Sequence, residues 1–406
     1  MVRKTVGPVV CLGCGCTCDD IAVTTERDRI TAAERACALG RAWFGDGQVP
    51  ARVRVGGADA DLDAAMARTA ELLRAGPALV YLAPGLSTEA QRAAIALADA
   101  AGARLDSVTS DTGAPSMLAA QRRGRATATL GEIRRRADLL VFWGVDPAER
   151  YPRYRERYTR RGAIIVAVDV GGERGPADAT ERIVLPADTE AAALGVMRAT
   201  IMKRPIPDLV APLAGAAALA ERMAQARYVA IVHDAEPAGT SDPQRAEGLT
   251  GLAQALNIPT RCALSSLRGG GNRPGADSAI TWQTGFPFAV DFTLGVPRYR
   301  PDEPASDVVG AVRAVVVAGE AAALPPTVVR GLGGRHVVAI GPRASESPFP
   351  VEVAIDTGIA GIHEGGIAYR LDDVPLPLTP ALAHPRSAAA VLDGLARALA
   401  RQAAAR

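Results

Sequence analysis

Four cysteines near the N-terminus are spaced in a way that suits a metal centre. Cys11, Cys14 and Cys18 follow a C-x2-C-x3-C pattern, and 18 residues separate the third of them from Cys37. Iron–sulfur clusters are held by four cysteine thiolates at family-specific spacings of this kind. The sequence therefore predicts a 4Fe–4S site at these four residues.

Two other interpretations of the cysteine loop stay open. Zn²⁺ also accepts four thiolates, although structural zinc sites usually take their ligands from two separated pairs. The thiols can also be reduced and carry no metal. Cys16 and Cys262 fall outside the spacing, and we interpret them as passive thiols.

Size and composition restrict the classes of protein that need to be considered. A chain of 406 residues is expected to form roughly two or three domains. Its net charge of +2 and its aromatic content of 4% argue against a nucleic-acid partner. No signal-peptide pattern and no apolar run of bilayer length is present. We therefore expect a cytoplasmic protein without a membrane partner.

The elements that must position the cysteine loop alternate between strand and helix. A helical pattern over residues 61–75 precedes a buried strand at 78–82, and Ser87 can cap the next helix, which leads to a strand at 104–108. Further strands are predicted at 137–143, 163–168, 182–185, 228–233, 258–263, 312–317 and 336–340, with helices at 188–202, 208–226 and 387–405. This alternation predicts an α/β protein with parallel sheets covered on both faces.

Several segments lack a regular pattern or a known catalytic motif. Residues 268–291 and 345–380 are rich in Gly or Pro, and such segments carry sites or form long connections. The Gly269–Asn272 stretch lacks the P-loop and dinucleotide patterns, so we expect a flexible loop. The basic, tyrosine-containing segment 149–161 is expected to be a solvated helix. Serine-hydrolase and zinc-hydrolase motifs are absent from the sequence.

Five blocks of the chain resemble the B subunit of formylmethanofuran dehydrogenase, in order and over nearly the whole length. They are residues 11–21, 37–40, 281–291 (Thr-Trp-Gln-Thr-Gly-Phe-Pro-Phe-Ala-Val-Asp), 297–300 and 368–371. That family belongs to the tungsten or molybdenum bis-pterin oxidoreductases. The resemblance implies a small N-terminal cysteine-loop domain and two interleaved doubly wound, nucleotide-binding-like domains. Such a fold is similar to the molybdopterin oxidoreductases without their C-terminal barrel.

The resemblance also implies where the domains lie. A small iron–sulfur-type domain is expected at 1–50. The first α/β domain is expected to combine 51–110 with 276–380, and the second to cover 111–275. Residues 381–406 are expected to form a C-terminal helix.

The chain departs from the catalytic members of this family at the metal anchor. Those relatives supply a cysteine followed by His-Gly-Pro, whereas this chain has Asp111 and Thr112 in the segment Ser110–Ser116. Tungsten and molybdenum favour a soft donor there, so no W/Mo-pterin and no catalytic residue is expected. The family's Arg-Gly-His-Tyr-Asn-type stretch corresponds to residues 268–272, with Gly270 in place of the histidine. The side chains that remain of a degenerate pterin and metal cleft are Asp111, Thr112, Arg268 and Asn272.

A B-type subunit without the metal anchor is similar to its counterpart in the bacterial formyltransferase/hydrolase complex of methylotrophs. That complex transfers a formyl group from tetrahydromethanopterin to a furan carrier and hydrolyses it to formate. The resemblance implies a structural subunit that is not itself catalytic. Its expected partners are an amidohydrolase-like hydrolase, a formyltransferase and a C-type subunit, with a furan-type formyl carrier bound by the complex. The alternatives are a catalytic W/Mo-pterin subunit of formylmethanofuran dehydrogenase and an iron–sulfur electron-transfer subunit.

Overall fold

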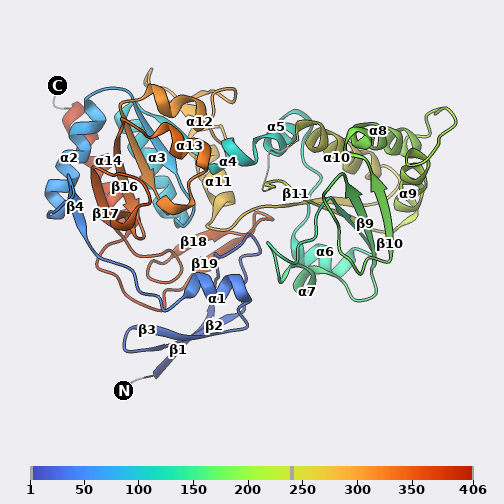
Figure 1. The fold of residues 1–406 in the computed structure, drawn as a ribbon, viewed down its shortest axis with the longest axis horizontal. Coiled ribbons are helices and arrows are strands. Elements are labelled where there is room, and N and C mark those ends of the chain that lie inside the picture. The colour runs from blue at the N-terminus through green and yellow to red at the C-terminus, as the bar shows by residue number, and fades with distance from the viewer. Residues whose placement is uncertain (1–2, 238–241, 405–406) are drawn as a thin grey trace. The chain divides into compact units, whose positions relative to one another are not determined.

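The structure is a computed structural model that describes residues 3–237 and 242–404. Contacts within the chain divide it into two compact units, and each is described by itself. Unit 1 comprises Met1–Asp111 and Gly269–Arg406, and unit 2 comprises Thr112–Arg268. Unit 1 therefore combines the two ends of the chain, which appear as blue and as orange to red segments side by side in Figure 1.

Unit 1 is built on an open nine-stranded sheet with the order β14-β13-β7-β6-β15-β16-β17-β4-β5. The strands are β4 Val53–Val55, β5 Ala58–Asp59, β6 Ala78–Leu82, β7 Arg104–Ser107, β13 Val290–Asp291, β14 Arg298–Tyr299, β15 Ala314–Ala318, β16 His336–Gly341 and β17 Val353–Asp356. The five central strands, β7 to β17 in that order, are parallel. Strands β6 and β15 are buried along their whole length, as expected for strands covered on both faces.

Helices cover both faces of this sheet because alternate side chains of each strand point to opposite sides. Val80 and Leu82 of β6 belong to a core shared with α2 (Leu62–Arg74), α3 (Thr88–Ala101), α11 (Arg273–Thr284) and α14 (Ala388–Ala404). Leu79 and Tyr81 of the same strand pack in a second core with α12 (Ala305–Val308) and α13 (Pro326–Gly331). Short helical turns complete the unit: α4 Val108–Thr112, at the border with unit 2, η2 Val309–Ala311, η3 Ala321–Ala323 and η4 Ala344–Glu346.

A small antiparallel sheet carries the cysteine loop in unit 1. Its strands are β1 Arg3–Val9, β2 Ile21–Glu26 and β3 Arg29–Glu34, and the loop connects β1 to β2. Cys37 caps the following helix α1 (Ala38–Phe44). Val10 and Leu12 of the loop pack against the hairpin of β18 (Gly366–Tyr369) and β19 (Pro375–Leu378).

Unit 2 contains a five-stranded parallel sheet with the order β10-β9-β8-β11-β12. The strands are β8 Leu139–Trp143, β9 Ile164–Val170, β10 Glu181–Leu185, β11 Val229–Asp234 and β12 Cys262–Leu267. The helices are α5 Ala114–Arg123, α6 Leu130–Arg136, α7 Tyr154–Tyr158, η1 Ala187–Thr189, α8 Glu190–Ile201, α9 Leu213–Gln225 and α10 Pro243–Leu256. Its apolar core joins the strands to α8, α9 and α10.

The predicted fold class is confirmed, and most predicted elements lie within a few residues of their expected positions. Three predictions of local secondary structure are wrong. The strand expected at 258–263 is β12, which starts only at Cys262 because Asn257 caps the preceding loop through hydrogen bonds to Ala253 and Cys262. The segment 268–291 contains α11, with Pro274 in its first turn.

The third wrong prediction concerns the tyrosine-rich segment 149–161. It contains only the short helix α7, and the side chains of Tyr151, Tyr154 and Tyr158 are buried. The Tyr154 hydroxyl forms a 2.9 Å hydrogen bond with Ser265 Oγ. The segment therefore packs on unit 2 instead of forming a solvated basic helix. Among the described helices of the whole chain, none combines the length and apolarity that a bilayer-spanning segment requires.

Candidate functional site

The cysteine loop is compact and closed by its own backbone. The amide of Cys11 donates to the carbonyl of Cys18 at 2.9 Å, and two amides point at sulfur, Gly13 N to Cys11 Sγ and Gly40 N to Cys37 Sγ, each at 3.4 Å. Cys11, Cys14 and Cys18 are buried, and Cys37 is half-buried. Amide groups aimed at sulfur stabilise negative charge there, as they do around iron–sulfur centres.

Neighbouring cysteines shift the thiol pKa values within the loop. Burial raises the pKa of the Cys11 thiol far above its usual value, and neighbouring charge on Cys14, Cys18 and Cys37 raises it further, against the Gly13 amide. A hydrogen bond with Cys16 lowers the pKa of Cys14. A cation would be needed to hold Cys11 as a thiolate in this setting.

The donor chemistry of the loop suits a metal, but the arrangement of the sulfur atoms does not complete a site. Over residues 3–237 and 242–404, no three or more His, Cys, Asp or Glu side chains are grouped so that they could hold a metal ion. The assignment of Cys11, Cys14, Cys18 and Cys37 as cluster ligands therefore stays a prediction.

The Gly269–Gly271 loop is packed between the cysteine loop and the turn after β6. Gly271 donates its amide to Leu12 O and accepts the amide of Gly85 at its own carbonyl, both at 2.8 Å. A Cβ atom built on Gly270 would lie 2.7 Å from Cys14 N and closer still to Leu12 O. The expected flexible loop is thus a close-packed one. No side chain fits at the position where the resemblance places a histidine.

Asn272 joins three parts of unit 1 and uses its amide group to do so. Its Nδ2 donates to Leu86 O at 3.0 Å and lies 3.2 Å from both Thr88 Oγ1 and Gln91 Oε1, and its Oδ1 accepts the amide of Tyr369 at 2.7 Å. The residue is 2% exposed and has a left-handed backbone, with φ of 62°. These contacts tie the start of α3 to β18. Asn272 is therefore a structural residue of unit 1.

Asp111 is half-buried and lies beside the buried Asp106 at the carboxyl ends of β6 and β7. Its Oδ2 accepts the Tyr81 hydroxyl at 3.2 Å, and its Oδ1 accepts the Ser306 amide at 3.3 Å. Asp106 lies nearby and accepts the Ser110 hydroxyl at 2.7 Å. Burial, aided by the charge of Asp111, raises the pKa of Asp106 to about 7 against its hydrogen bonds. Burial also raises the pKa of Asp111.

Sequence reasoning missed Asp106 and Tyr81. Their only signal was position: Asp106 stands near the end of a predicted strand, where open α/β sheets gather functional groups. Asp106 and Asp111 lie close together because β7 is followed directly by the helical turn α4, which the sequence analysis did not predict.

Arg268 and Thr112 belong to unit 2, whereas Asp111 and Asn272 belong to unit 1. The Arg268 Nε donates to Glu236 Oε1 at 2.8 Å, and both side chains are buried. A Cβ atom on Gly113, beside Thr112, would lie 3.3 Å from Glu236 Cγ. Arg268 thus forms a buried ion pair within unit 2. In unit 1, Asp111 and Asn272 have separate sets of partners.

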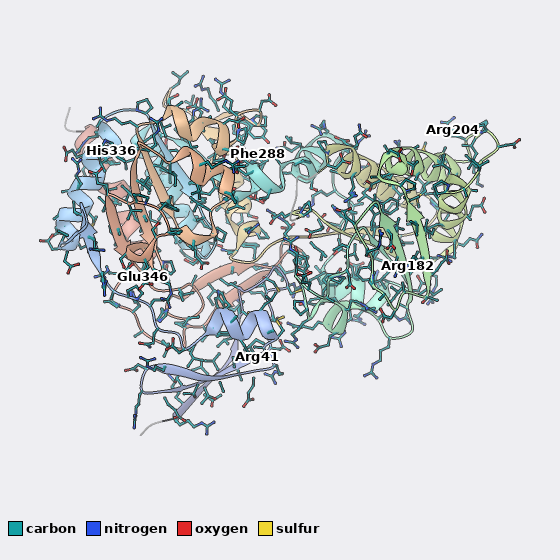
Figure 2. All side chains as sticks on the ribbon, in the orientation of Figure 1. Arg41, Arg182, Arg204, Phe288, His336 and Glu346 are labelled. Atoms are coloured by element: carbon teal, nitrogen blue, oxygen red, sulfur yellow. The ribbon has the colours of Figure 1, made fainter. Side chains whose placement is uncertain are left out.

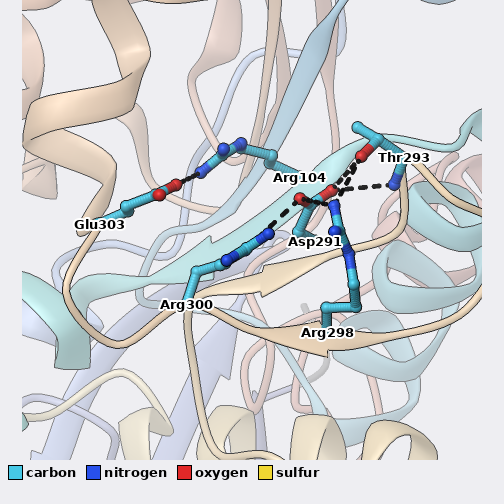
Figure 3. A network of polar contacts seen from close by, with 6 residues as sticks. All are labelled: Arg104, Asp291, Thr293, Arg298, Arg300 and Glu303. Atoms are coloured by element: carbon cyan, nitrogen blue, oxygen red, sulfur yellow. Dashed lines mark hydrogen bonds and ion pairs between the residues drawn. The ribbon is translucent and has the colours of Figure 1, made fainter.

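A polar network holds the family block at residues 281–291 onto the sheet. Asp291 accepts the Thr293 amide at 2.9 Å and the Thr293 hydroxyl at 2.6 Å, and its second oxygen accepts Arg298 Nη2 at 2.7 Å (Figure 3). Arg104 of β7 pairs with Glu303 in the same view. Burial opposes ionisation of Asp291, but these hydrogen bonds and the nearby arginines lower its pKa overall. The network fixes β13 and β14 beside β7.

The same block also presents aromatic side chains at the surface of unit 1. Trp282 is 56% exposed and contacts Tyr369 edge-on, with the ring centroids 5.8 Å apart. Phe286 stacks on Tyr299 at 5.1 Å. The block therefore has a structural part around Asp291 and an exposed aromatic part around Trp282.

Two open sheets with parallel central strands, together with a small antiparallel sheet that carries a cysteine loop, define a mixed α/β protein. Curated relatives identify the family. The chain is 30% identical to the B subunit of the tungsten-containing formylmethanofuran dehydrogenase 2 of Methanococcus maripaludis, over 93% of this chain and 94% of the relative. It is 29% identical to the same subunit of Methanocaldococcus jannaschii, over 94% and 95%. The chain belongs to the family of formylmethanofuran dehydrogenase B subunits, as the sequence blocks predicted.

A bacterial relative and a solved structure extend this result. The chain is 30% identical to the B subunit of the formyltransferase/hydrolase complex Fhc of Methylorubrum extorquens, over 78% of this chain and 87% of the relative. A chain in the crystal structure of FhcABCD from that organism, in complex with methylofuran, superimposes with a TM-score of 0.72. That match covers 87% of this chain and 99% of the other at 24% identity, and it shows the fold. No protein-family model matches the chain.

Proposed function

We propose that this chain is a non-redox structural subunit of a formyltransferase/hydrolase complex. The complex converts formyl-tetrahydromethanopterin to formate through a formyl-furan carrier, in one-carbon metabolism. The proposal rests on Asp111, which stands where the resemblance places the cysteine of catalytic relatives. Its carboxyl group is engaged by Tyr81 and Ser306 inside unit 1.

The chemistry of this position argues against a tungsten or molybdenum centre. A soft thiolate or selenolate is the anchor expected for these metals, and a carboxylate is a hard donor. Burial raises the pKa of Asp111 and so disfavours the ionised carboxylate that could bind a metal. Gly270 adds a second argument, because the backbone of Cys14 occupies the space that a histidine would need.

The proposed partners follow the Methylorubrum complex. They are an amidohydrolase-like hydrolase, a formyltransferase and a C-type subunit, with a furan-type formyl carrier bound by the assembly. The similarity to that complex, solved with methylofuran, supports this part of the proposal. The exposed Trp282 is a suitable anchor for such an interface, because large aromatic side chains dominate binding energy at protein interfaces.

Metal analysis of the native assembly tests the function. The tagged chain is purified without oxygen from its own host, and tungsten, molybdenum and co-purifying subunits are quantified. We expect the three partner subunits and neither metal. A catalytic family member purified in parallel serves as the control that the procedure retains its metal. Stoichiometric tungsten or molybdenum together with dithionite-dependent reduction of formate would overturn the proposal.

The intact cysteine set favours a second candidate function, electron transfer through a 4Fe–4S cluster. The experiment compares Cys14→Ser with Cys16→Ser, because both thiols are buried in the same loop and only Cys14 belongs to the predicted ligand set. A cluster predicts about four iron atoms per chain in the wild type and in Cys16→Ser, with iron lost from Cys14→Ser. Iron-free wild-type protein, or equal iron in both variants, would refute the cluster.

A further inference from the structure

A cavity of about 300 Å³ lies in unit 1 at the carboxyl ends of its central strands. Gly85 follows β6, Glu320 follows β15, and Pro342 and Arg343 follow β16, and all four residues line it. From β6 the sheet continues to β7 on one side and to β15 and β16 on the other. The cavity is therefore at the position where the strand order reverses, which is where open α/β sheets bind ligands. Its volume is at the lower end for small-molecule sites.

The opposite wall of the cavity comes from the end of α1 and the segment after it. Trp43 supplies aromatic surface and packs on the buried Phe44, with ring centroids 4.7 Å apart, and Asp46 and Gln48 follow them. Glu346 of η4 completes the rim, and Figure 2 shows it at the end of the sheet that lies toward α1. The lining of the cavity thus combines aromatic and polar groups.

The charges around the cavity are compensated except at one residue. Arg343 donates to Glu346 Oε2 at 3.0 Å and to Gln48 O at 2.6 Å, so its guanidinium is already engaged. Asp46 pairs with Arg29 at 2.6 Å. The Glu320 side chain has no hydrogen-bond or ion-pair partner among the described residues.

Glu320 therefore determines the character of the cavity. Glu320 is exposed to solvent, so its carboxylate is open to a ligand and is not closed off by a protein partner. A ligand cation can therefore pair with it directly. An anionic ligand would meet Glu320, Glu346 and Asp46 and no uncommitted basic side chain in the lining. The cavity is thus unsuited to phosphate groups.

We propose that this cavity binds a small organic amine whose ammonium group pairs with Glu320 and whose flat apolar part contacts Trp43. Carboxylates and an aromatic face are the two groups that proteins combine to recognise ammonium ligands. This inference is independent of the proposed structural role, since it concerns residues other than Asp111 and the four cysteines. It assigns unit 1 a ligand-binding activity of its own.

Calorimetric titration with three probes of one shape and different charge tests the proposal. Benzylamine, benzyl alcohol and benzoate are titrated into the purified native assembly at up to about 10 mM, a range suited to ligands of this size. We expect benzylamine to bind most tightly. Glu320→Gln should weaken benzylamine binding by about tenfold, the usual effect of removing a charged hydrogen-bond partner.

The matched control is Glu34→Gln, because Glu34 is an exposed glutamate of β3 outside the cavity. It should bind benzylamine as the wild type does, and both variants should unfold at the wild-type temperature. Trp43→Leu should weaken all three probes, which separates the aromatic contact from the charge. Benzoate binding as tightly as benzylamine, equal affinity in Glu320→Gln and the wild type, or no binding of any probe would each overturn the proposal.

Discussion

Substituting Gly270 by alanine tests the close packing of the triglycine loop on the cysteine loop. The new Cβ would lie 2.7 Å from Cys14 N and 2.8 Å from Cys14 Cα, and closer still to Leu12 O. All three are backbone atoms, so no side-chain rotation can relieve the contacts. Either the cysteine loop or the glycine loop must move.

The size of the effect follows from two opposing contributions. Overpacking in a closed region costs typically about 1–3 kcal/mol, and displacing the hydrogen bond from Gly271 N to Leu12 O adds about 1 kcal/mol. The lower entropy of an unfolded chain with alanine returns about 0.4–1 kcal/mol. We therefore expect Gly270→Ala to destabilise unit 1 by about 2 kcal/mol.

The matched control is Gly333→Ala, also in unit 1. A Cβ atom on Gly333 meets nothing within 4 Å, and its φ is not in the positive range that would strain alanine. This control should leave stability unchanged or raise it slightly. It shares the entropic contribution of a Gly→Ala change and lacks the contacts.

Urea unfolding followed by tryptophan fluorescence separates the two units, because Trp43 and Trp282 belong to unit 1 and Trp143 to unit 2. The rate of cysteine labelling gives a second measurement, since displacement of the loop should expose the buried thiols of Cys11 and Cys14. Equal stability of Gly270→Ala and Gly333→Ala, with unchanged labelling, would refute the packing argument.

Three further predictions concern buried polar residues of unit 1. Asn272→Ala should lower the free energy of unfolding by about 3 kcal/mol, because it leaves buried backbone groups unpaired and strains a left-handed residue. Asn272→Gly should cost less, because glycine adopts this backbone conformation without strain. Equal urea midpoints for the two variants would contradict the argument from strain. Asp106 has a folded-state pKa of about 7, above its ordinary value of 3.8. Its contribution to the free energy of unfolding is therefore complete below pH 3.8 and is lost as the pH rises to 7, by on the order of 4 kcal/mol in total. Asp106→Asn should remove this slope from unfolding measured between pH 4 and 8, and an unchanged slope would assign it to another group. The pH dependence expected from Asp291 has the opposite sign, because its pKa is lowered. Its contribution to the free energy of unfolding is present above pH 3.8 and is lost as the pH falls. Asp291→Asn should therefore make stability less dependent on pH in the acid range, and an unchanged dependence would argue against the network.

The sequence alone determined the class of fold, the family and much of the local structure. The strand at 78–82 was predicted residue for residue, because an apolar run between Pro77 and a cap signal leaves few alternatives. Ser87 caps α3 as expected, accepting the Ala90 amide at 3.2 Å. Local chemistry decides such features. The α/β class followed from their alternation.

Local patterns failed where distant residues decide the structure. The tyrosines of 149–161 looked like part of a solvated basic segment, yet Tyr154 is buried against Ser265 of β12. The helix α11 starts inside a glycine-rich stretch, because Asn272 holds its first turn against α3 and β18. Propensity carries no information about such partners.

Only the tertiary structure decided the sites. It packs Gly270 onto Cys14, places Asp106 beside Asp111, and brings Trp43 to the same cavity as Glu320. The first and third of these pairings join segments from the two ends of the chain within unit 1, whereas the second depends on the helical turn that follows β7. A residue's type and spacing indicate which chemistry it can perform, but its neighbours, and hence its charge state and the space around it, are set by the folded chain.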